Sequence, residues 1–184
     1  MRIPGVGGEV LKRAGGIPVT LPGGELFTAL QTGVIDATEW VGPYNDLTFG
    51  FHQIAKYYYY PGWHEPGSML ELLINKDEWD QLPNHLKAII ETAARAVNQD
   101  ILDEYTAKNN SALRELVDTH NVELRKLPDD VINEFKLIAN QILEENAKKD
   151  EMVNKVYQSY KSFKKDVSEY HKVSEDAFVE ARNN

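Results

Sequence analysis

The spacing of apolar residues changes near residue 83 and predicts two kinds of structure. Before this point, short apolar runs alternate with glycine and proline, which is typical of short strands and helices joined by tight turns. After it, apolar residues recur at intervals of three and four over long stretches, as they do on one face of a helix. We therefore expect a compact α/β part followed by a helical part.

The first part alternates extended and helical segments. "MRIPG" is expected to be extended, "GGEVLKRAGG" predicts a short helix, and "IPVTLPGG" predicts a buried strand ended by Pro-Gly. A helix over 25–32, with Gly33 as its C-cap, then precedes a strand at 34–39. This rhythm is the signature of a parallel or mixed sheet with helices on its faces.

Two more strands are expected before the change of period. Four consecutive tyrosines fall within a strand at 55–60, because tyrosine suits strands. A further strand is predicted at roughly 68–74, after which Asp77 is expected to act as an N-cap.

The second part begins with a long amphipathic helix from residue 83, which could bend near Asn109-Asn110. Its apolar stripe is formed by Leu86, Ile89, Ile90, Ala93, Val97, Ile101, Leu102, Tyr105, Leu113, Leu116 and Val117. "VELRKLP" then predicts a short strand, and a helix beginning at Pro128 follows. The apolar face of this helix consists of Val131, Phe135, Ile138 and Ile142.

The last segment carries a regular apolar seam in polar surroundings. Its spacing of three and four is of the coiled-coil type, and its members are Val153, Val156, Tyr160, Phe163, Val167 and Tyr170. A helix of about 30 residues would extend about 45 Å, farther than a small domain is wide. The seam either packs back on its own chain or contacts a second chain.

These patterns predict three regions. Residues 1–75 would form an α/β ligand-binding lobe with hinge strands, residues 76–150 a helical packing segment, and residues 151–184 a protruding helix for dimerisation. Hydrophobic residues make up 42% of the chain, which is enough for a core.

Charge and composition argue against several classes of partner. The net charge is −9 and no basic stripe is visible, so nucleic acid is not expected to bind. No apolar run approaches the roughly 20 residues of a membrane span. The absence of cysteine removes disulfides, thiolate metal sites and cysteine nucleophiles.

Common catalytic motifs are also absent. The chain has no G-x-S-x-G, H-E-x-x-H or P-loop, and its five histidines are scattered. A hydrolase that uses His64 with Glu65 or Glu39 is one alternative, but it lacks a nucleophile motif. We therefore expect a protein that is not an enzyme.

Polar side chains with binding chemistry lie at the ends of extended segments. Arg2 ends the first, Glu39 and Trp40 end the strand at 34–39, and Glu65 lies in the turn after the tyrosines. In open α/β sheets, ligands bind at the carboxyl ends of strands. These side chains are therefore candidates for one site.

The chemistry of this set fits an organic acid with a metal ion. Arginine grips a carboxylate with two parallel hydrogen bonds, whereas Glu39 and Glu65 would repel an anion unless a cation lay between them. Trp40 would close over the apolar part of the ligand, and its backbone carbonyl could bind the metal. The alternative is that both glutamates are solvated and Trp40 is a core residue.

One long stretch resembles a known family. "RIPGVGGEVLKRAGGIPVTLPGGELFTALQTGVIDATEWVGPYNDLTFGFHQIAKYYYYPGWHEPG" strongly resembles the solute-binding proteins of TRAP transporters, tripartite ATP-independent periplasmic transporters. It is most similar to the branch that binds α-keto acids and related monocarboxylates such as pyruvate or lactate. The similarity continues through "LPNHLKAIIETAA" and, more loosely, to the end of the chain.

The resemblance implies a role for each candidate residue. Arg2 matches the family arginine that pairs with the ligand carboxylate. Glu39 and Trp40 match the pair that lines the site and holds a cation, sodium or calcium, bridging to the ligand. Glu65, in "WHEPG", matches a further acidic position at the cation.

The resemblance also implies a fold and partners. The family fold is two α/β lobes joined by a hinge, so this chain is expected to be its C-terminal part, with a mixed sheet, flanking helices and a long C-terminal helical segment. The N-terminal lobe and the signal peptide for the periplasm would lie on a missing part. The implied partners are TRAP membrane subunits and a second copy bound through the terminal helix. A truncated, non-binding dimerisation or signalling module is the alternative.

Overall fold

The computed structural model describes residues 1–65, 67 and 70–183 and divides them between two compact units. The first unit contains Met1–Pro4 and Ile17–Ile132, and the second contains Gly5–Gly16 and Asn133–Asn184. The domain limits expected at residues 75 and 150 stay a prediction.

Parallel backbone pairing around Arg2 organises the first unit. Arg2 forms parallel bridges with Val19 on one side and Thr38 on the other. The next residue, Ile3, is buried and donates its N–H to the Val19 carbonyl at 3.1 Å. The prediction of extended segments that pair in parallel is therefore confirmed. The full strand predicted at 34–39 is wrong, since only single bridges form there. Pro4 and Pro18 flank these bridges and lack the N–H that a longer ladder needs.

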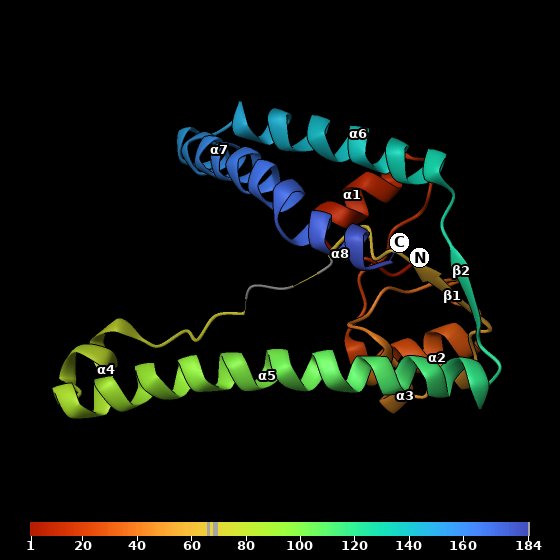
Figure 1. The fold of residues 1–184 in the computed structure, drawn as a ribbon, viewed down its shortest axis with the longest axis horizontal. Helices are drawn as coiled ribbons and strands as arrows, with labels where there is room; N and C mark the ends of the chain where they lie inside the picture. Colours follow the sequence, from red (N-terminus) through yellow and green to blue (C-terminus); the bar gives the residue numbers. More distant parts are fainter. Residues whose placement is uncertain (66, 68–69, 184) are drawn as a thin grey trace. The chain divides into compact units, whose positions relative to one another are not determined.

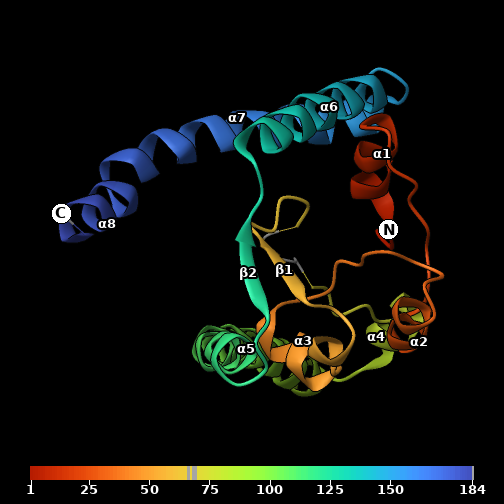
Figure 2. The ribbon, with the colours of Figure 1, turned by 90° about the vertical axis from the view of Figure 1, so that its right-hand side faces the viewer.

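The tyrosine run forms the sheet. Strand β1 (Tyr57–Tyr60) pairs in parallel with β2 (Glu123–Lys126), so Tyr57 lies opposite Glu123. The two strands run side by side in Figure 2. The strands predicted at 55–60 and within "VELRKLP" are confirmed. Within the described residues this sheet is parallel, not mixed.

The segment before the long helix differs from its prediction. Of the strand predicted at 68–74, residues 68 and 69 lie outside the described part, and residues 70–74 form no strand. Helix α4 (Lys76–Gln81) is capped by Asn75, not by Asp77. The Asn75 side chain accepts hydrogen bonds from the N–H groups of Asp77 and Glu78 at 2.9 and 3.3 Å, because an N-cap must precede the first helical residue.

Short helices surround the core of the first unit. They are η1 (Gly23–Glu25), α2 (Leu26–Gln31), α3 (Pro43–Thr48) and η2 (Phe51–Gln53). The predicted helix over 25–32 is thus confirmed as a 3₁₀ turn followed by α2, with Gly33 at a positive φ of 74° after its end. The buried core cluster consists of Leu26, Ala29, Ile35 and Phe51.

The predicted long helix is α5 (Asn84–Asp118), which continues for 35 residues through Asn109. Figure 1 shows α4 at one end of α5, and α3 packs against α5 near its other end. Ala112 and Leu116, in its C-terminal part, are buried. The N-terminal part of its apolar stripe, in contrast, is exposed at Leu86, Ile89, Val97, Ile101 and Leu102. No helix of the described residues combines the length and apolarity needed to cross a membrane.

The second unit is helical. It contains α1 (Gly5–Arg13), most of α6 (Asp129–Ala147), α7 (Glu151–Val173) and α8 (Glu175–Asn183). Its buried apolar residues are Val10, Ile138, Ile142 and Ala147. Ile138 and Ile142 belong to the apolar face predicted for α6, and their burial confirms this part of the prediction. Arg13 of α1 binds both carboxylate oxygens of Glu145 on α6, at 2.9 and 2.8 Å.

The terminal segment is not one helix. It is interrupted at Ser174, whose φ and ψ are −116° and −96°, so the prediction of about 30 unbroken helical residues is wrong. The Ser174 hydroxyl donates to the Tyr170 carbonyl at 2.8 Å, and such local hydrogen bonds compete with the helical pattern. The seam is not covered by its own chain: Val156, Phe163 and Tyr170 are all exposed.

The core of the first unit predicts a large effect at Leu26, whose side chain is fully buried at 0% exposure. Leu26→Ala is expected to lower the free energy of unfolding by about 2–5 kcal/mol, because it leaves a cavity. Leu73→Ala is the control: Leu73 is 84% exposed and should change stability by less than about 0.5 kcal/mol. Urea unfolding measures both, and equal effects would contradict this core assignment.

Candidate functional site

Arg2 and Glu39 form an ion pair that the backbone holds in place. The Arg2 N–H donates to the Ala37 carbonyl at 2.8 Å, and the Glu39 N–H donates to the Arg2 carbonyl at 3.3 Å. This pairing sets the two side chains next to each other, and Arg2 Nη1 contacts Glu39 Oε1. The side chains are only 12% and 10% exposed. Two charges are thus held close together with little access to water.

His64 lies next to the second carboxylate oxygen of Glu39. Its Nε2 lies 3.3 Å from Glu39 Oε2, and its side chain is 17% exposed. Each carboxylate oxygen of Glu39 therefore faces a nitrogen. Glu65, the residue predicted for the site from the same turn, is exposed, and its role at a cation stays a prediction. Sequence reasoning considered His64 only as an acid–base group, although its place in "GWHEPG" beside Glu65 was the available signal.

Trp40 is both a wall of this site and part of the core. Its ring lies 5.0 Å from the Phe49 ring, centroid to centroid, and 5.5 Å from the Arg2 guanidinium carbon. It also packs against the core cluster. A Cβ at Gly23 would lie 2.5 Å from the Trp40 ring, so only glycine fits there without a shift of the indole. Packing of Trp40 on the core is therefore observed, and its closure over a ligand stays a prediction.

Asp46, in α3, is a buried carboxylate that sequence reasoning did not assign to the site. It is 8% exposed, and its Oδ2 accepts a hydrogen bond from the Tyr58 hydroxyl at 2.5 Å. Burial raises the pKa of Asp46 to about 6, against the opposing effect of the Tyr58 hydrogen bond. The nearby charge of Glu39 raises the pKa further. The partner, Tyr58, lies in β1, where the sequence alone could not show which tyrosine faces inward.

Several buried polar side-chain atoms of the first unit lack a hydrogen-bond partner within the described residues. They are Trp40 Nε1, Asn45 Oδ1, Asp46 Oδ1, His52 Nδ1 and His64 Nδ1. Buried polar groups are normally hydrogen-bonded. Trp40 and His64 contact the ion pair, so their unpaired atoms are candidates to bind a small polar ligand.

The oxygen atoms of this site suit a hard cation only in part. The Glu39 carboxylate and the Trp40 carbonyl are of the type that sodium or calcium binds. However, the residues that the structure describes contain no group of three or more His, Asp or Glu arranged to hold a metal ion. Further oxygen ligands would have to come from the bound acid or from outside the described residues.

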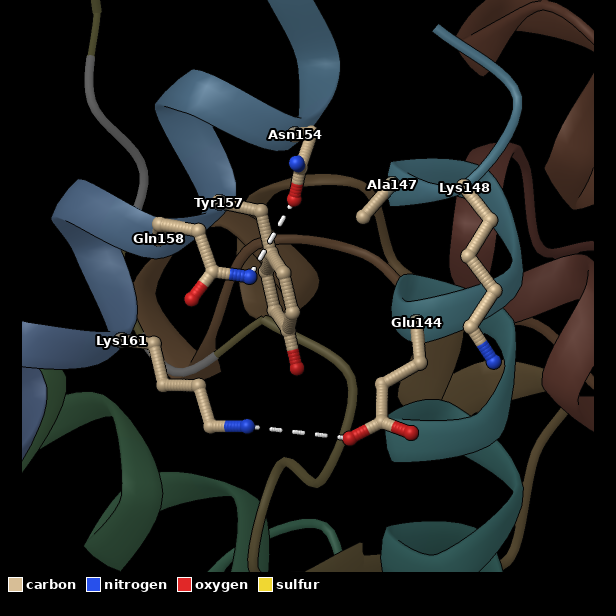
Figure 3. A pocket seen from close by; sticks show the side chains of 7 residues that line it. All are labelled: Glu144, Ala147, Lys148, Asn154, Tyr157, Gln158 and Lys161. Atoms are coloured by element: carbon tan, nitrogen blue, oxygen red, sulfur yellow. Dashed lines mark hydrogen bonds and ion pairs between the residues drawn. The ribbon is translucent and has the colours of Figure 1, made fainter. Parts of the chain in front are cut away.

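Two surface hollows lie apart from this site. One, of about 370 Å³, is lined in the first unit by Leu72, Ile74, Trp79, Ile90, Glu91 and Ala94. The other, of about 220 Å³, lies in the second unit between α6 and α7. Figure 3 shows Lys161 pointing toward Glu144 across this second hollow, with Tyr157 between the helices. The hollow is held by a 3.7 Å ion pair between Lys161 and Glu144.

Comparison with known proteins identifies the family. Residues 1–150 match the bacterial extracellular solute-binding protein family 7, so this chain belongs to that family. A relative from Nostoc sp., a monocarboxylate 2-oxoacid-binding periplasmic protein, is 41% identical over 175 residues, which cover 95% of this chain and 48% of the relative. The resemblance inferred from the sequence is confirmed.

Solved structures confirm the fold. A TRAP periplasmic solute-binding protein from Pseudoalteromonas atlantica, with bound sodium and pyruvate, matches 98% of this chain with a TM-score of 0.92 and 39% identity. One from Colwellia psychrerythraea, with bound calcium and pyruvate, matches 98% with a TM-score of 0.93 and 38% identity. A TRAP transporter solute-binding protein from Bordetella bronchiseptica, a mixed-occupancy dimer with calcium and picolinate in one site, matches 99% with a TM-score of 0.91 and 33% identity.

The chain spans about half the length of the relatives it matches. It covers 48% of the Nostoc protein and 55%, 55% and 54% of the three structures. The fold is thus that of part of a periplasmic solute-binding protein, with a small parallel sheet and many helices.

Asp46 predicts an unusual dependence of stability on pH. Because its folded pKa of about 6 lies above the ordinary 3.8, its contribution is fully present below pH 3.8 and is lost as the pH rises through about 6. The difference corresponds to about 3 kcal/mol. Asp46→Asn cannot ionise and should lose about 2–3 kcal/mol less than the unsubstituted chain between pH 4 and pH 8.

Urea unfolding at a series of pH values measures this difference. Asp36→Asn, at an exposed position, is the matched control and should keep the pH profile of the unsubstituted chain. Parallel profiles for Asp46→Asn and the unsubstituted chain would contradict the assignment of a raised pKa.

Proposed function

We propose that this chain is part of the solute-binding subunit of a TRAP-type transporter, which captures a 2-oxo or 2-hydroxy monocarboxylate together with sodium or calcium. The relative from Nostoc sp. that is named for 2-oxoacids, and the similar structures with pyruvate and sodium or calcium, support this substrate class. Arg2 would bind the carboxylate of the acid. Glu39 and the Trp40 carbonyl would bind the cation, with Glu65 as a further acidic residue at it.

The buried Arg2–Glu39 pair is the observation that carries this proposal. An acid that takes Arg2 from Glu39 would leave a buried carboxylate without its strongest partner, which is costly. A cation beside Glu39 removes that cost, because it replaces the lost positive charge. The acid and the cation therefore bind by a balanced exchange: Arg2 changes from Glu39 to the acid as the cation takes its place.

Trp40 and the unpaired polar atoms fit the size of the ligand. The indole presents an apolar face beside the Arg2 guanidinium, which suits the short carbon chain of a monocarboxylate. The unpaired Trp40 Nε1 and His64 Nδ1 supply hydrogen-bonding groups for the oxygen at carbon 2 of the acid.

The proposed setting is the periplasm, where the complete protein would deliver its ligand to TRAP membrane subunits. The relatives are about twice this length, and a second lobe in the part that this chain does not match would close over the ligand. The exposed apolar residues in the N-terminal part of α5 support such a lobe, because apolar surface of this kind is usually covered. In this proposal the chain has no chemistry of its own.

A second candidate function is pairing of two chains through α7. The seam residues Val156, Phe163 and Tyr170 are exposed at coiled-coil spacing, and the similar structure from Bordetella bronchiseptica is a dimer. A dimerisation module that does not bind ligand would share this surface but would not respond to acids. A homodimer that binds ligand has both properties.

The proposed exchange of Arg2 from Glu39 to the acid predicts that affinity for the acid depends on the cation. It also predicts that affinity depends on the two parallel hydrogen bonds that an arginine guanidinium can donate. Arg2→Lys keeps the charge but loses the second parallel hydrogen bond, so pyruvate affinity should fall about tenfold or more. Arg13→Lys, which alters an exposed salt bridge in the other unit, should leave affinity unchanged. Calorimetric titration with pyruvate and lactate, with and without calcium or sodium, measures this.

The titration is made on this chain and on a chimaera completed with the remaining half of the Pseudoalteromonas atlantica relative. Binding to neither, across a panel of 2-oxo and 2-hydroxy acids with either cation, would contradict the proposed function. Equal affinity with and without a cation would contradict the exchange.

The exposed seam predicts self-association. Phe163 is 68% exposed, and Phe163→Glu should shift the chain toward monomer, because it places charge in an apolar interface. Ser162→Glu adds the same charge one position away, off the seam, and should keep the dimer. Sedimentation equilibrium distinguishes them, and a monomeric unsubstituted chain at micromolar concentration would refute pairing through α7.

A further inference from the structure

Tyr44, the second residue of α3, is contacted by three residues of α5: Tyr105, Lys108 and Asn109. Lys108 Nζ donates to the Tyr44 hydroxyl at 3.0 Å and lies 4.7 Å from the centre of its ring. Tyr105 packs edge-on against the same ring, with 6.0 Å between centroids. Asn109 Oδ1 accepts a hydrogen bond from the Tyr44 backbone N–H at 3.0 Å. Residues from one turn of α5 thus fix a residue 65 positions earlier in the chain.

The Asn109 contact satisfies a need at the start of α3. The first N–H groups of a helix have no partner within the helix, and an N-cap side chain usually supplies one. The N-cap of α3 is Gly42, which has no side chain, and Pro43 at the next position has no N–H. The Tyr44 N–H is therefore the first donor that needs a partner. Asn109 provides the acceptor from another helix.

Gly42 packs closely against the Asn109 side chain. A Cβ at Gly42 would lie 3.2 Å from Asn109 Oδ1, closer than most real contacts. Glycine at this position lets the α5 amide approach the backbone. The sequence "VGPYND" thus lacks a capping side chain at the place where Asn109 enters.

The segment fixed in this way carries the site. Glu39 and Trp40 lie between two anchors: the bridge of Thr38 with Arg2 and the start of α3 at Asn109. Only three residues separate Trp40 from Tyr44. A shift at the start of α3 would therefore displace the Trp40 carbonyl and the Glu39 carboxylate, and displacements of about 1 Å are large for a binding site.

We propose that Asn109 is a positioning residue for the ligand and cation site: it caps α3 from α5 and so sets the geometry of Glu39 and Trp40. The inference rests on the proposed function for its effect on binding, but the cap itself does not. Asn109 touches neither ligand nor cation in this assignment.

Three variants test the proposal. Asn109→Leu has a similar size and no acceptor, whereas Asn109→Asp keeps an oxygen that can accept the Tyr44 N–H. Asn110→Leu is the matched control, at the neighbouring exposed position of the same helix. Hydrogen–deuterium exchange of the full chain is measured at the Tyr44 amide and in residues 38–44, without ligand and then with calcium chloride and sodium pyruvate.

Without ligand, Asn109→Leu should speed exchange of the Tyr44 amide by about three- to tenfold, the effect of losing one hydrogen bond. Asn109→Asp and Asn110→Leu should exchange as the unsubstituted chain does. The same rate at Tyr44 in Asn109→Leu would overturn the cap. A rise that is uniform through the first unit, or equal in Asn109→Asp, would overturn it too.

With calcium and pyruvate, the unsubstituted chain should slow its exchange in residues 38–44. Asn109→Leu should need about tenfold more pyruvate for the same protection. Asn109→Asp should need the same pyruvate concentration as the unsubstituted chain. An unchanged pyruvate requirement in Asn109→Leu would overturn the positioning role. If pyruvate protects no variant, not even the unsubstituted chain, the proposed function and the positioning role built on it both fail, while the ligand-free comparison still decides the cap.

Discussion

A carboxylate removed from water needs a partner of opposite charge, and Glu39 meets this constraint through Arg2. Both side chains are largely buried, and His64 faces the remaining oxygen of Glu39. Removing one member of a buried pair costs far more than the pair contributes. Under the proposed function, this constraint would make the ion pair a binding device, because neither charge can leave unless another replaces it. An organic anion and an inorganic cation together satisfy that condition.

The surrounding structure keeps this pair in register. Parallel bridges place residue 2 between residues 19 and 38, and Trp40 packs on the core while it faces Arg2. Asn109 fixes the start of α3 from the long helix. The site is therefore built from segments distant in sequence. In the proposed function, a further lobe would cover the exposed apolar stripe of α5.

Local patterns predicted what local chemistry determines. Turn residues marked where extended segments end, so Arg2, Glu39 and Trp40 were identified as candidates, and apolar spacing located α5 and α6. Contacts between distant segments were not predictable in this way: nothing near Asp46 or Asn109 in the sequence shows that each reaches the site region, and His64 had only its place beside Glu65 as a signal. Similarly, the helix period predicted one terminal helix, whereas the Ser174 hydroxyl bonds back to Tyr170 where the helix breaks. Strand length was overestimated where prolines remove ladder donors.

The most direct test of the exchange is a crystal structure of the protein with calcium and pyruvate bound. The account predicts that the Arg2–Glu39 contact is broken, with the Arg2 guanidinium on the pyruvate carboxylate and calcium on Glu39 and the Trp40 carbonyl. Pyruvate bound while Arg2 still contacts Glu39, or bound with no cation beside Glu39, would contradict it.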